Sequence, residues 1–404
     1  MMTFIKRLFK SRGVDRSIYI SVVILTIFGI VMIGSASVGD TATYGASYAT
    51  KNMIKQIVFV LVGYAMMIFF TRCFKKKWIT SKSSWFFYFA GLAAMLSCLA
   101  FGDVKGSYAW IKLPGGMTIQ PAEFMKIVMI LFLSFHFGEM EEMCQIPRAL
   151  TKEKKEKLQI KKLFYCLLKP LMAIFLVFGI GGFVQKDLGS AMIIFFICLM
   201  MGFVTPRPYY SKYKKLILIM MAVAGILLLF GATFILKPYQ LGRINTWLHP
   251  LEDAKNTGWQ LANALIAFSS GGLFGQGFGA SKQKFGYIPE SHNDFIMAII
   301  YEELGIIGLA LIMIPYCIII FKMFNYAIKI NDTKSKLILY GIGTYFFAHL
   351  LINIGGVSGF IPMTGVPLLL VSSGGSSTLA AMIGIGIAQS IIAKYNRDQL
   401  KEQL

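Results

Sequence analysis

Long apolar runs separated by short basic segments recur along the whole chain. Each run is about twenty residues long, which is enough for a helix to cross a hydrocarbon core of roughly 30 Å. The pattern predicts an all-α integral membrane protein with about ten transmembrane helices. The expected spans are residues 17–38, 53–71, 84–101, 119–138, 164–184, 187–204, 216–236, 294–321, 337–360 and 369–393.

The connection between the seventh and eighth spans, residues 237–293, is much longer than the others. A connection of this length is usually functional or disordered. Its apolar stretch Trp259–Phe268 predicts a helix, which argues for an ordered segment. We therefore divide the chain into a basic N-terminus, one membrane domain that includes this large external loop, and a short tail, with bounds 1–16, 17–393 and 394–404.

The formal net charge is +21, although 56% of the 404 residues are hydrophobic. A basic balance is typical of nucleic-acid-binding proteins, but also of the cytoplasmic loops of membrane proteins. The positions of the basic residues favour the membrane-protein interpretation over nucleic-acid binding. In the ten-span arrangement, 28 of the 40 Lys and Arg residues fall on the side of the membrane that holds both termini. This predicts a multi-pass protein with cytoplasmic termini, and no nucleic-acid partner is needed to explain the charge.

Ionisable side chains within the spans are candidate functional residues, because each costs a few kcal/mol or more unless it pairs or lines a cavity. Glu123 and Lys126 in the fourth span are spaced i, i+3 and share a helical face. We expect Lys126 to pair with Glu123 or with Asp187, which opens the sixth span. The alternative is that the Glu123–Lys126 pair is structural and that Asp187 only caps its helix.

A second polar group closes the large loop and opens the eighth span. Glu290, His292 and Asp294 lie within five residues beside the long loop, which favours a site over a simple helix cap at Asp294. Glu302 and Glu303 follow about two turns later. Because adjacent residues of a helix point in different directions, we expect at least one of these two carboxylates to face a polar interior.

Two glycine-rich segments and the isolated histidines admit simpler interpretations. The segment 269–279 lacks the strand–loop–helix context and the Lys-Ser/Thr ending of a phosphate-binding loop, which predicts a tight external turn. The Ser/Gly run at 372–377 is typical of close helix packing. His136 and His349 within the spans are expected to be packing residues.

Six short motifs occur in chain order on these spans: Gln120-Pro121-x-Glu123-x-x-Lys126, Asp187-Leu188-Gly189-Ser190, Gly271-Gly272-x-x-Gly275-x-Gly277-x-Gly279, Pro289-Glu290-x-His292-x-Asp294-Phe295, Glu302-Glu303-Leu304-Gly305 and Gly374-Gly375-Ser376. Together they resemble the SEDS family (shape, elongation, division and sporulation), which includes RodA, FtsW and SpoVE. The resemblance extends from about Asp15 to Tyr395 and is nearer to the FtsW/SpoVE branch. The chain departs from the family at Ala109, where an Arg is usual.

The resemblance implies a peptidoglycan glycosyltransferase of the bacterial cytoplasmic membrane. Such an enzyme polymerises lipid II, an undecaprenyl-linked substrate, at the outer face of the membrane during cell division, shape maintenance or sporulation. Its implied partners are a class B penicillin-binding protein and other division or elongation proteins. The implied site residues are Asp294 as the catalytic residue and, for the cavity and substrate, Glu123, Lys126, Asp187, Arg243, Trp110, Glu290 and His292.

Glycan polymerisation on a lipid carrier joins a sugar hydroxyl to an anomeric carbon and expels a lipid pyrophosphate. A carboxylate must take the proton of the hydroxyl, for which Asp294 is the candidate. Positive charge must stabilise the pyrophosphate, with Arg243, Lys126 or a divalent cation (Mg²⁺ or Mn²⁺) as candidates and no metal ligands assigned. Two alternative functions stay open: a lipid II flippase, which needs a polar path but no base, and a non-catalytic scaffold that recruits a cell-wall synthase.

Overall fold

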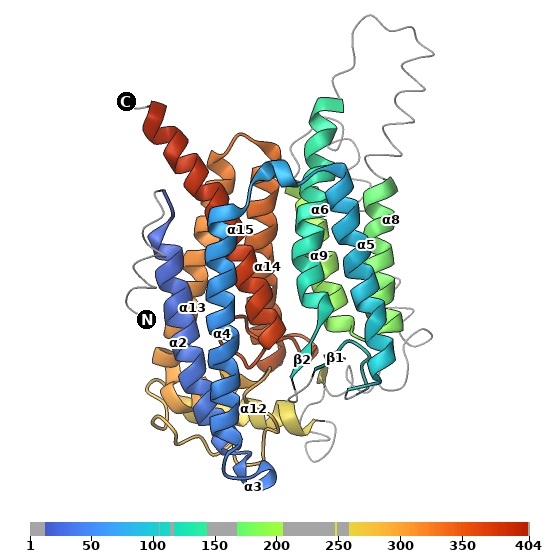
Figure 1. Cartoon of the computed structure of the whole chain (residues 1–404). Coiled ribbons are helices and arrows are strands. Elements are labelled where there is room, and N and C mark those ends of the chain that lie inside the picture. Colours follow the sequence, from blue (N-terminus) through green and yellow to red (C-terminus); the bar gives the residue numbers. More distant parts are fainter. Residues whose placement is uncertain are drawn as a thin grey trace, which may run out of the picture.

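The computed structural model describes residues 13–104, 106–113, 117–143, 168–204, 247–248 and 258–402. The long helices among these residues form a bundle and run roughly along one common direction, while α12 (Trp259–Gly271) lies across one end (Figure 1). Seven of the described helices are long and apolar enough to cross a membrane, and two shorter apolar segments, Lys169–Val184 and Leu188–Val204, pack against each other. The expectation of an all-α integral membrane protein is therefore confirmed.

Nine of the ten expected spans coincide with described helices, and the span expected at 216–236 lies outside the described residues. The helices that correspond to these nine spans are α2 (Arg16–Val38), α4 (Tyr48–Cys73), α5 (Ser81–Ser97), α6 (Pro121–Met143), α8 (Lys169–Gly179), α9 (Leu188–Val204), α13 (Ile296–Lys329), α14 (Thr333–Val357) and α15 (Gly375–Glu402). Shorter helical elements are α3 (Thr41–Tyr44), η1 (Lys76–Trp78), η2 (Cys98–Phe101), η5 (Ile180–Val184) and α12 (Trp259–Gly271).

Three of the long helices begin at polar N-caps. Asp15, Thr80 and Asp332 each accept a hydrogen bond from a backbone amide in the first turn of α2, α5 and α14, respectively. Such a side chain satisfies an amide that has no partner inside the helix. Because the cap positions are set by single polar residues before apolar runs, the sequence specifies these helix starts locally.

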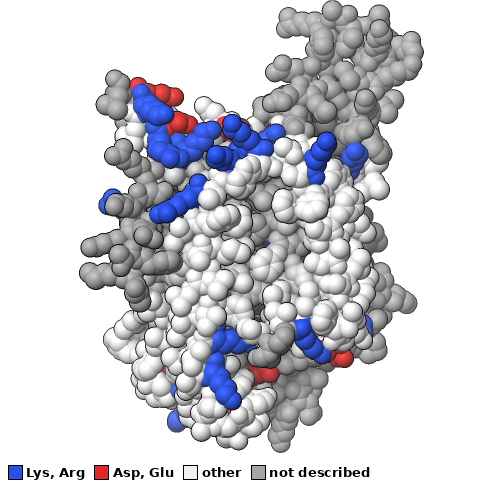
Figure 2. Space-filling model, viewed as in Figure 1, with Lys and Arg blue, Asp and Glu red and all other residues white. Residues whose placement is uncertain are grey.

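The start of the described chain and the last helix lie at the same end of the bundle. Asn396 Nδ2 donates to Gly13 O at 2.7 Å, and Gln389 binds both the N–H and the carbonyl of Asp15. Figure 2 shows Lys and Arg gathered at this end, above a band of other residues that covers the middle of the molecule. We call this end of the bundle the basic end.

Helix α13 is broken at Gly305, whereas the expected eighth span was continuous. Gly305 has φ +58° and ψ −142°, which lies outside the helical region. Residues 272–287, which we call the glycine loop, pack into the break. Ile306 N donates to Leu273 O at 3.0 Å, and a Cβ on Gly305 would lie 2.5 Å from the same oxygen. Only glycine fits this backbone and this approach. Past the break, the helix runs to Lys329, beyond the expected end.

The last span also differs from expectation, because α15 begins at Gly375 rather than at 369. Residues 358–374, which we call the α14–α15 segment, enter the bundle without helical structure. Leu368 and its neighbours are buried, Leu370 has φ +65°, and Tyr316 Oη donates to Leu369 O at 2.6 Å. Non-helical backbone at membrane depth is tolerated where protein surrounds it, and it commonly marks a site.

At the end of the bundle away from the basic end, α12 confirms the helix expected within the large loop. A small antiparallel sheet lies at the same end (Figure 1), formed by β1 (Ile111–Lys112) and β2 (Thr118–Ile119). Ile111 pairs with Ile119. Each strand has two residues, which is too short for a period-2 pattern to be recognised in the sequence.

Candidate functional site

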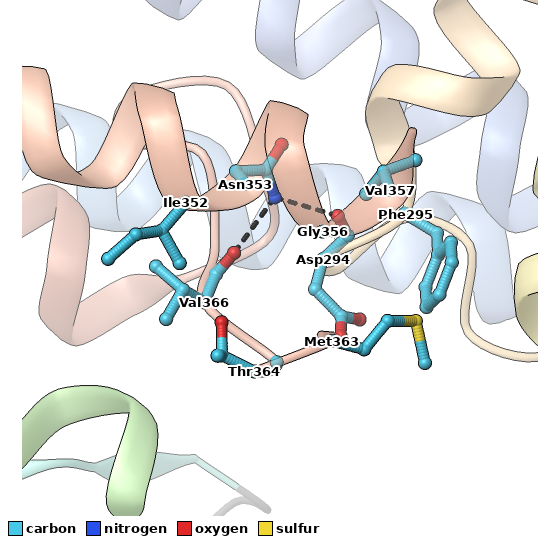
Figure 3. A pocket seen from close by; sticks show the side chains of 10 residues that line it. Asp294, Phe295, Ile352, Asn353, Gly356, Val357, Met363, Thr364 and Val366 are labelled. Atoms are coloured by element: carbon cyan, nitrogen blue, oxygen red, sulfur yellow. Dashed lines mark hydrogen bonds between the residues drawn. The ribbon is translucent and has the colours of Figure 1, made fainter. Parts of the chain in front are cut away.

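Asp294 lines a small pocket at the end of the bundle away from the basic end (Figure 3). Three parts of the chain form its walls: the residues just before α13, the last turns of α14, and the α14–α15 segment. In Figure 3 the carboxyl group of Asp294 points toward the loop that carries Met363 and Thr364. A Cβ on Gly365 would lie 3.7 Å from its Oδ2 atom, so this loop passes close to the carboxylate.

Asn353 holds two walls of this pocket together. Its buried Nδ2 donates to Asp294 O and to Val366 O, both at 2.8 Å. The amide therefore joins the start of α13 to the α14–α15 segment across the end of α14, and Figure 3 shows both bonds. This arrangement fixes the backbone that carries the candidate base.

The helix-cap alternative for Asp294 finds no support in the position of the residue. The N-cap of α13 is Phe295, one residue later, and its side chain makes no capping bond. Asp294 is half-buried and lines a pocket that three parts of the chain share. A carboxylate in such a place can accept a proton from a bound hydroxyl.

Glu123 and Lys126 form a buried ion pair inside the bundle, which confirms the expected pairing. Glu123 Oε1 lies 2.6 Å from Lys126 Nζ, and the two side chains are 2% and 0% exposed. The ammonium also lies 3.0 Å from His349 Nε2. Pairing with hydrogen bonds is what makes a buried charge tolerable.

Asp187 does not pair with Lys126, the other partner considered for it. Its Oδ1 accepts from Ser190 N at 3.1 Å and so caps α9, while its Oδ2 accepts from Gln120 Nε2 at 2.6 Å. Gln120 N in turn donates to Ser376 Oγ at the start of α15. Asp187 is therefore both a cap and one end of a polar link between α9, α6 and α15.

Glu290 and His292 do not line the Asp294 pocket. Glu290 has φ +50° and accepts from Asn293 Nδ2 at 3.0 Å. His292 is buried with Nδ1 at 3.3 Å from Asp40 Oδ2, and its carbonyl accepts from Ser373 N. Both residues shape the turn that leads into α13, so the structure places them beside the pocket rather than in it.

The remaining predicted residues are spread over different parts of the molecule. Trp110 is half-buried just before β1, in a segment held on the α8–α9 turn by the bond from Tyr108 N to Gln185 O. Arg243 lies outside the described residues. Lys126 Nζ is committed to the buried pair described above, so the structure does not present it to the Asp294 pocket.

Glu302 and Glu303 are buried and both have polar partners inside the molecule, as expected for at least one of them. Glu302 accepts from Ser281 Oγ at 2.5 Å and from the backbone amide of Lys282. Glu303 lies 2.8 Å from the buried ammonium of Lys284. These contacts fasten the glycine loop to α13.

The glycine loop is a tight turn, as expected, and its amides are used internally. Gln276 N and Gly277 N donate to the carbonyls of Glu302 and Glu303 at 2.8 and 3.0 Å. A Cβ on Gly275, at φ +77°, would lie 2.2 Å from Glu303 O. Amides occupied in this way are not presented to a phosphate.

Sequence reasoning missed two buried polar residues of α14, His349 and Asn353. A signal was present, because Tyr345, His349 and Asn353 recur every four residues and therefore share one face of the helix. A polar face within an apolar span indicates a polar interior rather than packing. In the structure this face turns toward Lys126 and the α14–α15 segment.

A divalent cation held by the protein alone needs several oxygen, nitrogen or sulfur ligands close together. Within the described parts of the chain, no three or more His, Cys, Asp or Glu side chains come close enough together to hold a metal. They therefore do not form a metal site by themselves, and no step of the chemistry below depends on a metal.

The family model for FtsW/RodA/SpoVE, described as cell cycle protein, matches residues 15–397. FtsW of Bacillus subtilis (strain 168), named a probable peptidoglycan glycosyltransferase, is 32% identical over 405 residues, which cover 99% of this chain and 95% of the relative. A similarly named FtsW of Lactococcus lactis is 33% identical, with 97% and 96% covered. Stage V sporulation protein E of B. subtilis is 30% identical, with 96% and 99% covered.

Solved structures share the fold at lower sequence identity. A chain from a study of the "structural coordination of polymerization and crosslinking by a peptidoglycan synthase complex" aligns with a TM-score of 0.71 and 22% identity, covering 96% of this chain and 98% of that one. The crystal structure of the rod shape determining protein RodA of Thermus thermophilus aligns with a TM-score of 0.63 and 20% identity, with 96% and 97% covered. The arrangement of helices described above is therefore common to these proteins.

Proposed function

The chain belongs to the FtsW/RodA/SpoVE family of cell cycle proteins, and we propose that it is a peptidoglycan glycosyltransferase that polymerises lipid II at the outer face of the cytoplasmic membrane. Relatives named as such glycosyltransferases match it over nearly their whole length, which supports this assignment. The observation that carries it is a half-buried carboxylate, Asp294, in a pocket opposite the basic end.

The orientation follows from the positive-inside rule. The basic end carries both ends of the described bundle and is proposed to face the cytoplasm, so that Asp294 would lie on the outer side. Reporter fusions at Lys157 and Lys212 are expected to read cytoplasmic, and one near Lys255 external. A cytoplasmic signal at Lys255 would overturn the ten-span assignment.

Asp294 is proposed to accept the proton of the attacking sugar hydroxyl as that oxygen bonds to the anomeric carbon of the second lipid-linked sugar. The bond from that carbon to the lipid pyrophosphate breaks, and the pyrophosphate departs with the electron pair. Fixing the Asp294 backbone through Asn353 keeps the base in place relative to the pocket. Arg243 is the candidate for stabilising the departing charge, because Lys126 is held in the buried pair.

A class B penicillin-binding protein is the proposed partner. One structural neighbour comes from a peptidoglycan synthase complex that coordinates polymerisation with crosslinking. A polymerase that makes uncrosslinked glycan needs such an activity beside it. The FtsW and SpoVE relatives favour a role in division or sporulation over one in elongation.

Purified protein incubated with fluorescent lipid II tests the function directly. A polymerase produces a ladder of glycan strands on a gel, and Asp294→Ala abolishes it. The matched control is Asp103→Ala, which removes an exposed aspartate outside the pocket and leaves the ladder intact. Transfer of labelled lipid II across vesicle bilayers without a ladder would instead establish a flippase. Absence of both polymerisation and lipid II transfer, with partner binding retained, would establish a scaffold.

A further inference from the structure

We infer that His349 is a positioning residue that couples the buried Glu123–Lys126 pair to the wall of the Asp294 pocket. The inference rests on the proposed polymerase function for its kinetic consequence, but not for its structural one. His349 lies in α14, is fully buried, and touches both the ion pair and the α14–α15 segment. It is therefore placed between the two polar sites of the molecule.

The two ring nitrogens of His349 have different and fixed roles. Nδ1 lies 3.0 Å from Pro367 O, and a carbonyl oxygen only accepts, so Nδ1 carries the proton. Nε2 is then an acceptor, and it lies 3.0 Å from the Lys126 ammonium, which only donates. The neutral imidazole is therefore held in one tautomer and one orientation, with the ammonium at Nε2 and the carbonyl at Nδ1. The partner of one ring nitrogen commonly fixes the role of the other in this way.

His349 binds the carbonyl of Pro367, and the preceding carbonyl, that of Val366, accepts the Asn353 bond that joins two walls of the pocket. Asn353, one helical turn further along α14, donates to the carbonyl of Val366, the residue before Pro367. Two consecutive carbonyls of the α14–α15 segment are therefore bonded to two side chains on one face of α14. This pair of bonds fixes both the position and the rotation of the segment relative to the helix.

Residues 364–367 connect the carbonyl bound by His349 to the pocket wall beside Asp294, and their backbone has little conformational freedom. Pro367 has a fixed φ, and the residue before a proline is confined to extended conformations, so Val366 has little freedom. Thr364 and Gly365 come directly before Val366 and form part of the pocket wall, where Gly365 approaches the carboxyl group of Asp294. A displacement of about 1 Å in this wall is enough to lower a catalytic rate roughly a hundredfold.

Two conservative substitutions separate the two bonds of His349. The amide nitrogen of Asn occupies the place of Nδ1, so His349→Asn keeps the bond to Pro367 O and loses the one to Lys126. The amide of Gln reaches the place of Nε2, so His349→Gln keeps the contact with Lys126 and loses the bond to Pro367. His349→Leu removes both. Thr344→Val, which changes another buried polar residue of α14, is the control.

Hydrogen exchange measured by mass spectrometry on purified protein reads the structural coupling without any assay of activity. We expect exchange in peptides covering 363–374 to be about tenfold faster in His349→Gln and His349→Leu and near wild type in Thr344→Val. In His349→Asn, which keeps the bond to Pro367 O but loses the orienting contact with Lys126, we expect a smaller increase of about threefold. Peptides from the middle of α15 should be unchanged in all four. Wild-type exchange in the Asn variant, or no change in the Leu variant, would overturn the coupling.

Kinetics with lipid II distinguish positioning from a stabilising role. We expect kcat to fall by about tenfold or more in His349→Gln, with KM changed less than twofold and the melting temperature within a few degrees of wild type. A kcat that merely follows the melting temperature across the three variants would reduce His349 to a packing residue. If the wild-type protein makes no glycan, the proposed function fails, while the exchange experiment still decides the coupling.

Discussion

Two lysine–glutamate pairs are buried in the part of the chain that the structure describes, and they differ in what they join. Lys126 and Glu123 belong to one helix and are 2.6 Å apart. Lys284 and Glu303 come from the glycine loop and from α13, and are 2.8 Å apart. All four side chains are at most 2% exposed, so burial alone does not distinguish the pairs.

The partners of the two glutamates show the difference. Both oxygens of Glu303 are bonded: Ser35 Oγ lies 2.7 and 2.8 Å from them, and Gly279 N donates at 3.0 Å. Glu303 thus ties α2, the glycine loop and α13 together. Glu123 binds Lys126 through Oε1, while its Oε2 has no hydrogen-bond partner among the described residues.

A saturated pair and an incomplete pair have different consequences. The donors to Glu303 come from α2 and from the glycine loop, so the Lys284–Glu303 pair holds this loop against α2 and α13. The Glu123–Lys126 pair lies next to a neutral histidine that leads to the pocket. We therefore expect the first pair to govern folding and the second to govern activity.

The largest effect on stability is expected from Glu303→Ala. The change leaves the buried Lys284 ammonium without its carboxylate, which costs about 3–5 kcal/mol. Thermal unfolding in detergent should show a large fall in melting temperature, and limited proteolysis should cut the loop at 273–287. The comparison between the pairs is wrong if Glu303→Ala melts within a degree or two of wild type.

A smaller loss of stability with a larger loss of activity is expected from Lys126→Met. An unpaired Glu123 in the bundle is costly, so the double variant Glu123→Gln/Lys126→Met should recover part of the lost stability. Polymerase activity should stay low in both, because Lys126 no longer orients His349. Strictly additive losses in a double-mutant cycle of melting temperatures would count against the pairing.

The smallest effect is expected at a third pair that is partly exposed. Lys76 Nζ lies 2.7 Å from Asp332 Oδ1, with the side chains 40% and 38% exposed. Burial alone would raise the pKa of Asp332, but hydrogen bonds from Lys76 and Ser335 outweigh it and lower the pKa below its usual value. A lowered pKa stabilises the fold above the unfolded value of about 4, and this stability is lost as the pH falls through the folded pKa.

The variant Asp332→Asn tests whether the ion pair stabilises the fold at neutral pH and loses this effect in acid. Asn still caps α14, so only the ion pair is lost, which costs about 0.2–1 kcal/mol at an exposed site. The difference in unfolding free energy between wild type and variant should be measurable at pH 6, shrink below pH 4, and decrease with added salt. A difference that grows on acidification would contradict the assigned direction.

Local signals in the sequence predicted most of the fold. Apolar runs located the helices, and the i, i+3 spacing of Glu123 and Lys126 predicted their pair. The break at Gly305 and the late start of α15 were not foreseen, because both depend on distant contacts. The backbone conformation of Gly305 depends on the close approach of Leu273 O. The non-helical conformation of the α14–α15 segment depends on hydrogen bonds from side chains of other helices, such as Tyr316.

The candidate site was predictable to a lesser degree. Asp294 was identified from its place at the end of a long loop and from the family resemblance. The role of Asn353 was not, because it follows from two carbonyls that meet only in the folded chain. His349 was assigned to packing since a single histidine in an apolar span does not reveal that a lysine lies across from it.

The most direct test of the central claim is polymerisation by Asp294→Asn, measured with purified protein and lipid II on a glycan-ladder gel. Asn preserves size but cannot take a proton, and the N-cap of α13 is Phe295, so the helix should be unaffected. We predict normal protein level, melting temperature and partner binding, with polymerisation reduced by a factor on the order of a hundred or more. Full polymerase activity in Asp294→Asn would contradict the assignment of Asp294 as the base.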